Sequence, residues 1–326
     1  MAYSANLRHS EVNLMRSPIT LITVLVMITT RIQCFAQSPD GNAKTLAAQI
    51  SQQQLIVKTV TGNKGWQAWL KLAVLLQDAA KYRESEDAYL TTIDLVKSEN
   101  PAVMADVMDH MGTMYVENGE LAKAEPMERQ ALAVREEEHD QLGAGVSHMH
   151  LAMLLLGEND FGSAEAEAED AVKLLVPEYS SSSVRSAATP EEKMTALIDL
   201  SLVHSATDAW ATAVPNLRWA LKIAHASYPD DSIPVGYIEF LLGYASWKSG
   251  DSQSADELMR QGVRELATQV GWGHPTYVRV LWQYQRYLSQ TGLTHEARQV
   301  EKELKNMDHS VDSAAARNGN LAIARK

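Results

Sequence analysis

The chain has 326 residues, of which 45% are apolar and 21% charged, and its formal net charge at pH 7 is -12. These values are typical of a folded soluble protein. The acidic excess argues against non-specific nucleic-acid binding, which needs a basic surface. Aromatic residues are sparse, alanine is abundant and β-branched runs are short, so the composition favours helices over strands.

The first 36 residues have the pattern of a secretory signal peptide. Arg8 and Arg16 precede an apolar stretch that ends before Arg31, and small residues follow at Cys34 and Ala36. The stretch is shorter than the ~20 residues that span a bilayer, so we predict cleavage after Ala36. The mature chain would then be periplasmic or secreted, without a membrane span and without a cysteine; a membrane anchor through an uncleaved segment is the alternative.

A capping helix with its lead-in is expected over residues 37–65, and a helix-turn-helix pattern then recurs over 66–179 (repeats 1–3) and 191–307 (repeats 4–6). The repeats align on one small residue in each second helix, namely Ser85, Ala124, Ala164, Ala213, Ala255 and Ala297. Twelve residues earlier, five of the six positions are also small. Antiparallel helices approach closely only where side chains are small, so we expect Ala124 to face Gly112.

Turn residues separate the two helices of a repeat. Gly and Asn occur in the turns at 117–120, 157–160 and 248–251, where they can adopt the left-handed conformation that ends a helix. A serine-rich segment, residues 180–190, is predicted to be a mobile loop, either as a linker between two arrays or as a functional loop. A flexible tail is expected over 308–326.

The helix after this loop carries a clear start signal. Thr189 and Glu192 have the spacing of a capping box, and Pro190 suits the first helical position. We therefore expect the fourth repeat to open with a helix that begins at Pro190.

The repeats resemble the tetratricopeptide repeat, in its kinesin-light-chain subtype. The residues of the second repeat that carry the resemblance are Met108, Met111, Gly112, Tyr115, Ala124 and Ala131. Glu128 departs from the pattern because it stands where the family has an aromatic residue. The resemblance implies an all-α, right-handed superhelical solenoid of about six helix-turn-helix repeats that binds a protein or peptide in its concave groove.

The family pattern also implies which residues face that groove. They are Asp106, Asp109, Met149 and Met153 toward the N-terminal end, and Tyr237, Phe240, Tyr244, Trp247, Trp282 and Arg286 toward the C-terminal end. Arg279 belongs to a basic rim that flanks the second group. The aromatic group is interpreted either as packing between repeats or as a cradle for a peptide beside a basic rim. Asp106 and Asp109 are also interpreted as part of a solvated acidic surface.

No catalytic constellation stands out in the sequence, so no enzyme activity and no cofactor are predicted. His148 and His150 are two residues apart and point in different directions on a helix, so no metal site is predicted either. The predicted function is an exported scaffold for a protein or peptide partner of unknown identity. A regulatory or assembly module of an enzyme complex and a self-associating structural protein are the alternatives.

Overall fold

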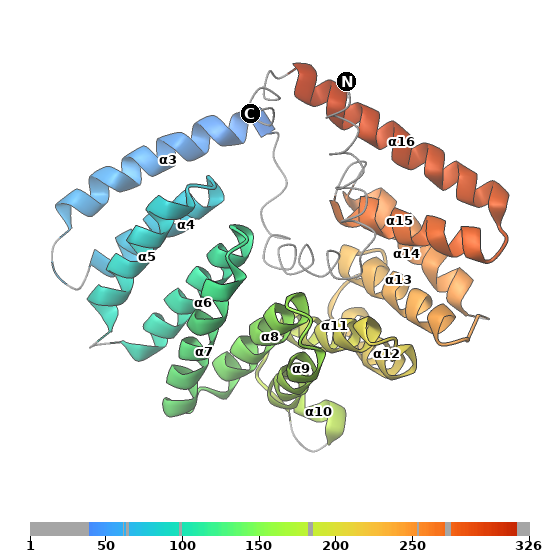
Figure 1. Ribbon diagram of the computed structural model, residues 1–326, viewed down its shortest axis with the longest axis horizontal. Helices are drawn as coiled ribbons and strands as arrows, with labels where there is room; N and C mark the ends of the chain where they lie inside the picture. The colour runs from blue at the N-terminus through green and yellow to red at the C-terminus, as the bar shows by residue number, and fades with distance from the viewer. Residues whose placement is uncertain are drawn as a thin grey trace. The chain divides into compact units, whose positions relative to one another are not determined.

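The computed structural model describes residues 39–317 apart from 61, 63–64, 98–99, 182–184, 253 and 271–274 (Figure 1). Every regular element within these residues is a helix, which confirms the predicted all-α repeat solenoid. The chain divides into two compact units, Met1–Thr207 and Asp208–Lys326, here called unit 1 and unit 2. The predicted signal peptide falls outside the described residues, and no described helix is long and apolar enough to cross a membrane.

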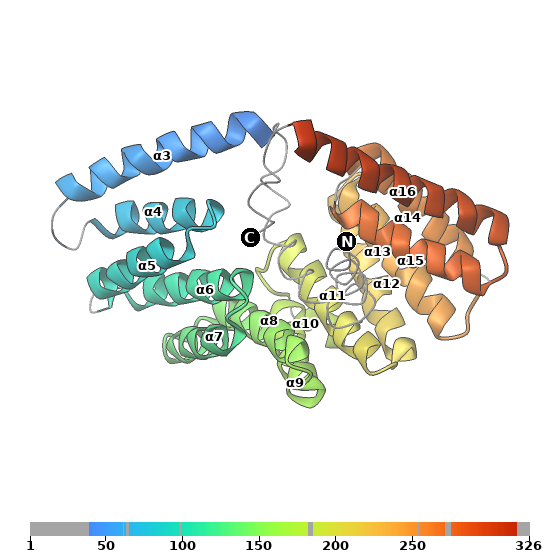
Figure 2. The ribbon, with the colours of Figure 1, turned by 45° about the horizontal axis from the view of Figure 1, so that its top comes forward.

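Unit 1 consists of a leading helix, three helical hairpins and a closing helix. Its elements are α3 (Pro39–Thr59), α4 (Trp66–Asp78), α5 (Tyr82–Val96), α6 (Pro101–Glu117), α7 (Leu121–Glu137), α8 (Gln141–Gly157), α9 (Phe161–Leu175), the short α10 (Pro177–Ser180) and α11 (Pro190–Ala206). The hairpins are α4/α5, α6/α7 and α8/α9, and they stack in chain order (Figure 2). Helix α3 packs on α4, and α11 packs on α9 and α8.

Unit 2 consists of one leading helix and two hairpins. Its elements are α12 (Trp210–Ser227), α13 (Ile233–Lys248), α14 (Ala255–Val270), α15 (Pro275–Gln290) and α16 (Thr294–Arg317). Helix α12 packs on α13, and α13/α14 and α15/α16 form the hairpins. Its apolar core includes the fully buried side chains of Phe240, Met259, Leu266 and Leu281.

The predicted turn and cap chemistry is confirmed. Gly119, Asn159 and Gly250 all have positive φ, at 77°, 66° and 95°, so each ends a helix in the left-handed conformation. The capping box before α11 forms in both directions: the Thr189 amide donates to Glu192 at 2.6 Å, and the Glu192 amide donates to Thr189 Oγ1 at 3.2 Å.

Close helix approach at small residues is seen in both units. In unit 1 the Ser85 hydroxyl donates to the Ala73 carbonyl at 2.8 Å, and both residues are fully buried. In unit 2 a Cβ added at Gly243 would lie 2.8 Å from the Ala255 carbonyl oxygen. A larger side chain at these positions would therefore push the two helices of a hairpin apart.

Two boundaries in the structure differ from those predicted from the sequence. The division between the units falls after α11, so the two helices of the predicted fourth repeat belong to different units. Helix α16 continues to Arg317, into the segment predicted as a tail, because the run from Ala314 to Ala316 has high helix propensity. Residues 318–326 are outside the described part of the chain.

Candidate functional site

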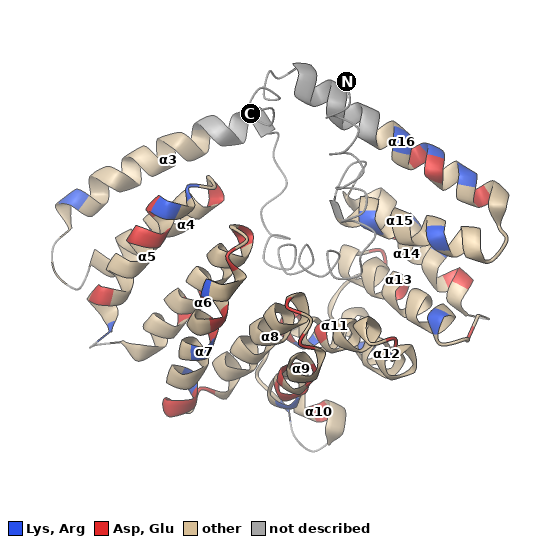
Figure 3. Cartoon of the chain, viewed as in Figure 1, with Lys and Arg blue, Asp and Glu red and all other residues tan. Residues whose placement is uncertain are grey.

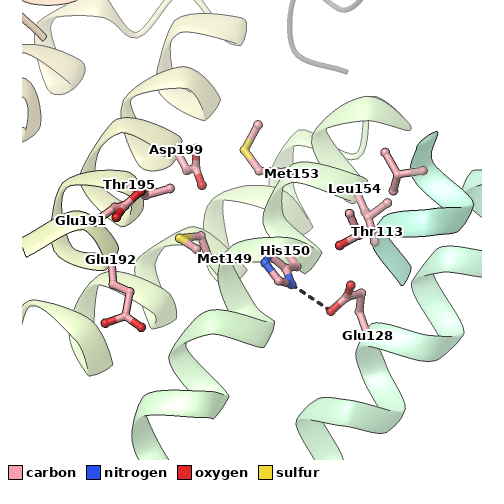
Figure 4. A pocket seen from close by; sticks show the side chains of 11 residues that line it. Thr113, Glu128, Met149, His150, Met153, Leu154, Glu191, Glu192, Thr195 and Asp199 are labelled. Atoms are coloured by element: carbon pink, nitrogen blue, oxygen red, sulfur yellow. Dashed lines mark hydrogen bonds and ion pairs between the residues drawn. The ribbon is translucent and has the colours of Figure 1, made fainter. Parts of the chain in front are cut away.

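Unit 1 contains a cavity of about 190 Å³ between α6, α7, α8 and α11 (Figure 4). Its lining residues are Thr113, Val116, Glu128, Met149, His150, Met153, Leu154, Glu191, Glu192, Thr195 and Asp199. Met149 and Met153 are two of the residues that the family pattern placed in the groove. Figure 4 shows Asp199 and Thr195 on one wall, facing Met149, His150 and Met153 on the other.

Glu128 is buried where the repeat pattern has an aromatic residue. It is 1% exposed, and its carboxyl group fills the space that Gly112 leaves on α6: a Cβ at Gly112 would lie 2.9 Å from Glu128 Cδ. The sequence predicted that Gly112 makes room for Ala124. The structure shows that the nearest atoms to this position belong to Glu128, one turn further along α7.

Glu128 and His150 form a buried pair. The His150 Nδ1 lies 3.2 Å from Glu128 Oε2. Burial raises the pKa of Glu128, and His150 opposes this rise. Burial disfavours the charged form of His150, but the adjacent Glu128 carboxylate outweighs this effect and raises the pKa of His150. Because the charge on each group shifts the pKa of the other, Glu128 and His150 titrate as one coupled pair.

Arg135 holds the neighbouring acidic residues in place. It is 6% exposed, and its Nη2 lies 2.9 Å from Asp106 Oδ1 and 2.5 Å from Asp109 Oδ2. Its Nη1 donates to Ser147 Oγ at 2.7 Å. Asp106 is exposed, as a solvated acidic face requires, whereas Asp109 is buried and paired. The interpretation of both residues as solvated surface is therefore wrong for Asp109.

Asp199 differs from these groups because it is buried and has no partner among the residues that the structure describes. It is 5% exposed and makes no hydrogen bond or ion pair with a described residue. Burial raises the pKa of Asp199 to about 8, and the charge of His150 opposes this rise. The sequence analysis did not select Asp199, although one signal was available: it is the only charged residue in the apolar run from Ala196 to Val203.

Three ligand-type side chains from different helices converge beside the cavity. One potential ligand atom from each of Asp109, Glu128 and His150 lies within 4.8 Å of the others. The Arg135 guanidinium already pairs with Asp109 and brings a positive charge that opposes a cation. We therefore assign no metal here. His148, the other residue weighed in the sequence, instead pairs with Glu167 at 2.6 Å.

The aromatic residues predicted to face the groove in unit 2 pack largely against one another. Phe240 is fully buried, and Tyr237, Tyr244 and Trp247 are partly buried against the core of unit 2. The Trp247 ring meets Tyr244 edge to face with centroids 5.4 Å apart. Among the described residues this geometry favours packing for these side chains, as the first interpretation proposed.

The remaining predicted residues of unit 2 lie on α15. Trp282 is 52% exposed, and Arg286 is also exposed. The guanidinium nitrogens of Arg279 are buried and have no hydrogen-bond partner among the described residues. Acidic and basic side chains are otherwise spread over both units, with acidic residues frequent on α9 (Figure 3).

A comparison with protein families agrees with the helical repeat fold. Residues 104–140 match the tetratricopeptide repeat family model, and this stretch includes most of α6 and all of α7. A comparison with curated protein sequences gave no match.

Three solved structures share the fold. A kinesin light chain of Podosopora anserina with nearly identical repeats is 18% identical, with a TM-score of 0.54, and the match covers 66% of this chain and 99% of that one. The apo form of RapI is 12% identical, with a TM-score of 0.63 and coverages of 91% and 76%. A Rap protein solved with Competence and Sporulation Factor is 11% identical, with a TM-score of 0.53 and coverages of 92% and 88%. At these identities the likeness concerns the fold, and the chain thus carries a tetratricopeptide repeat within a helical repeat fold like that of kinesin light chains.

Proposed function

We propose that this protein is an exported scaffold that binds a segment of a protein or peptide through unit 1, without catalysis of its own. One observation carries the proposal: the cavity between α6, α7, α8 and α11 presents, beside two methionines, the buried carboxyl group of Asp199, which no residue in the described part of the chain pairs with. Helical repeat proteins use such inner surfaces for binding because stacked hairpins leave one helix of each pair facing inward.

The volume and lining of the cavity favour a single side chain of a bound polypeptide over a complete drug-sized organic molecule. Its volume of about 190 Å³ is below the ~300–1,000 Å³ of sites that enclose drug-sized ligands. A cavity of this size suits one side chain of a longer segment. Met149 and Met153 add flexible, polarisable surface that adapts to the shape of a ligand.

The structural neighbours support the same class of function. The Rap protein with a similar fold was solved in complex with Competence and Sporulation Factor, so a protein with this helical architecture forms a complex with a partner. The acidic net charge of this chain, -12, would steer basic partners toward it.

The test is selection from a phage-displayed peptide library against the mature chain. The selected peptides are then measured by calorimetry against two folded variants, Thr195→Trp, which fills the cavity, and Trp282→Ala, which removes the exposed aromatic residue of α15. We expect binding to be lost in Thr195→Trp and kept in Trp282→Ala. Binding lost only in Trp282→Ala would move the site to unit 2, and a library that yields no binder would reject the proposal.

Export rests on the sequence of residues 1–36 and has a test of its own. When the full chain is expressed in a secreting host, the mass of the mature protein shows where processing occurs. We expect the first residue to be Gln37. A product that retains Met1 in the cytoplasm would contradict export and leave the binding proposal unaffected.

A further inference from the structure

We propose that the cavity of unit 1 anchors an arginine side chain of the bound segment, with Asp199 accepting its guanidinium group. This inference rests on the proposed function and adds the chemistry of the ligand. It predicts that the bound segment is recognised by one cationic side chain that inserts between α8 and α11.

The first step concerns the partners of the buried acidic residues in unit 1. Asp109 pairs with Arg135, and Glu128 pairs with His150. Asp199 is equally buried, yet no described residue pairs with it. A buried carboxyl group without a partner is costly, so such groups are uncommon in folded proteins unless a ligand completes them. Because Asp199 lines the cavity, its missing partner can enter from there.

The second step concerns the charge of the cavity. Four carboxyl groups line it, from Glu128, Glu191, Glu192 and Asp199, against the single imidazole of His150. That imidazole is already bound to Glu128. The carboxylates of Glu191 and Glu192 therefore make the lining negative, which favours a cation and disfavours an acidic side chain. Asp199 is protonated in the empty cavity and releases its proton when a guanidinium group pairs with it.

The third step concerns shape and hydration. Val116, Met149, Met153 and Leu154 form the apolar part of the lining. A long aliphatic stem can cover such a surface while its charged head reaches a polar group. Arginine suits a buried carboxyl group better than lysine does, because its planar fork forms two parallel hydrogen bonds and is less strongly hydrated.

A metal ion fits Asp199 less well than a guanidinium does. The ligand atoms that converge within 4.8 Å belong to Asp109, Glu128 and His150, and Asp199 is not among them. A single carboxylate does not make a specific site for a divalent cation, which takes several converging ligands. An organic cation needs only one carboxylate at the end of an apolar channel.

The experiment uses nuclear magnetic resonance of the mature chain labelled with ¹³C in its methionine methyl groups. Met149 and Met153 report on the cavity, and Met→Leu substitutions assign their signals. The probes are the peptide acetyl-Ala-Ala-Arg-Ala-Ala-amide and the same peptide with citrulline, which has the shape of arginine without its charge. We expect saturable shifts of both signals with the arginine peptide and at least tenfold weaker binding of the citrulline peptide.

Matched variants locate the effect at Asp199. Asp199→Asn keeps the shape of the side chain, and we expect it to weaken binding of the arginine peptide at least tenfold. Asp87→Asn removes an exposed carboxylate on α5 and serves as the control with unchanged binding. Thr195→Trp, which fills the cavity, should abolish the shifts of both methionine signals.

The outcomes separate this inference from the proposed function. If library-selected peptides bind the cavity but tolerate citrulline in place of arginine, or bind Asp199→Asn as tightly as the natural chain, the arginine anchor is wrong and the scaffold function stands. If neither the arginine peptide nor any selected peptide shifts the Met149 and Met153 signals, both proposals fail. Binding that requires both arginine and Asp199 supports both.

Discussion

Replacing Asp199 by asparagine should stabilise the empty protein, and the gain should grow with pH. Burial raises the pKa of Asp199 from the ordinary value of 3.8 to about 8. Between these values the folded chain holds a proton that the unfolded chain has released. A group whose folded pKa is raised stabilises the fold at low pH and loses that contribution as the pH rises. Asparagine has no proton to hold, so the substitution removes this loss.

The size of the stability gain follows from the raised pKa of Asp199 in the folded chain. One proton bound only in the folded state changes the free energy of unfolding by ~1.4 kcal/mol for each pH unit. Relaxation of the site and entry of water reduce this, so we expect a slope of about 1 kcal/mol per pH unit. Asp199→Asn should thus gain about 2 kcal/mol more at pH 7 than at pH 5. Glu128 and His150 also titrate, but they are present in both chains and their contributions largely cancel in the difference.

The assay is urea unfolding followed by circular dichroism at pH 5, 6, 7 and 8. Asp87→Asn, at an exposed position, is the control and should give the same small change at every pH. An Asp199→Asn effect that stays constant between pH 5 and pH 8 would refute the reasoning, since it would mean that Asp199 ionises normally in the folded chain. The stabilised variant is also the one expected to lose arginine binding, so stability and function trade against each other at this residue.

Further substitutions test the packing around both sites. Gly112→Ala should cost about 1–3 kcal/mol because its Cβ collides with the buried Glu128 carboxyl group, and adding Glu128→Ala should recover part of that loss in a double-mutant cycle. Arg135→Met should cost about 3–5 kcal/mol in urea unfolding because it strips a buried aspartate of its ion pair; a cost below about 1 kcal/mol would show that the pair is solvated. Trp247→Ala should cost about 3–5 kcal/mol, whereas Trp282→Ala, at a 52% exposed residue, should change stability by less than about 0.5 kcal/mol. Equal losses of thermal stability at the two tryptophans would contradict their different burial.

The repeat architecture could be predicted because its signals are local. A small residue equivalent to Ala124 occurs in the second helix of every predicted repeat. Turn residues such as Gly119 and Asn159 end the helices through their own backbone conformation. These features act within about 40 residues of one another, so spacing alone reveals them. Met149 and Met153 share a helix face for the same reason, and both line the cavity, while their role in a binding groove stays a prediction.

What spacing could not show is which side chains from separate hairpins meet. The family pattern marked Glu128 only as an exception, and its role depends on the space beside Gly112 and on His150 from the next hairpin. The two histidines were judged by their separation on one helix, whereas each of them pairs with a carboxylate on another helix. Partners of this kind are set by how hairpins stack.

The sequence by itself determined the helices, their turns, the repeat period and the acidic character of the chain, because each depends on backbone propensity or composition. Only the tertiary structure decided that Asp199 is buried with no partner in the described part of the chain, that Asp109 pairs with Arg135, and that Tyr244 and Trp247 pack within unit 2. The physical reason is that burial and charge pairing depend on distances between residues far apart in the chain, and these distances exist only after the repeats have packed.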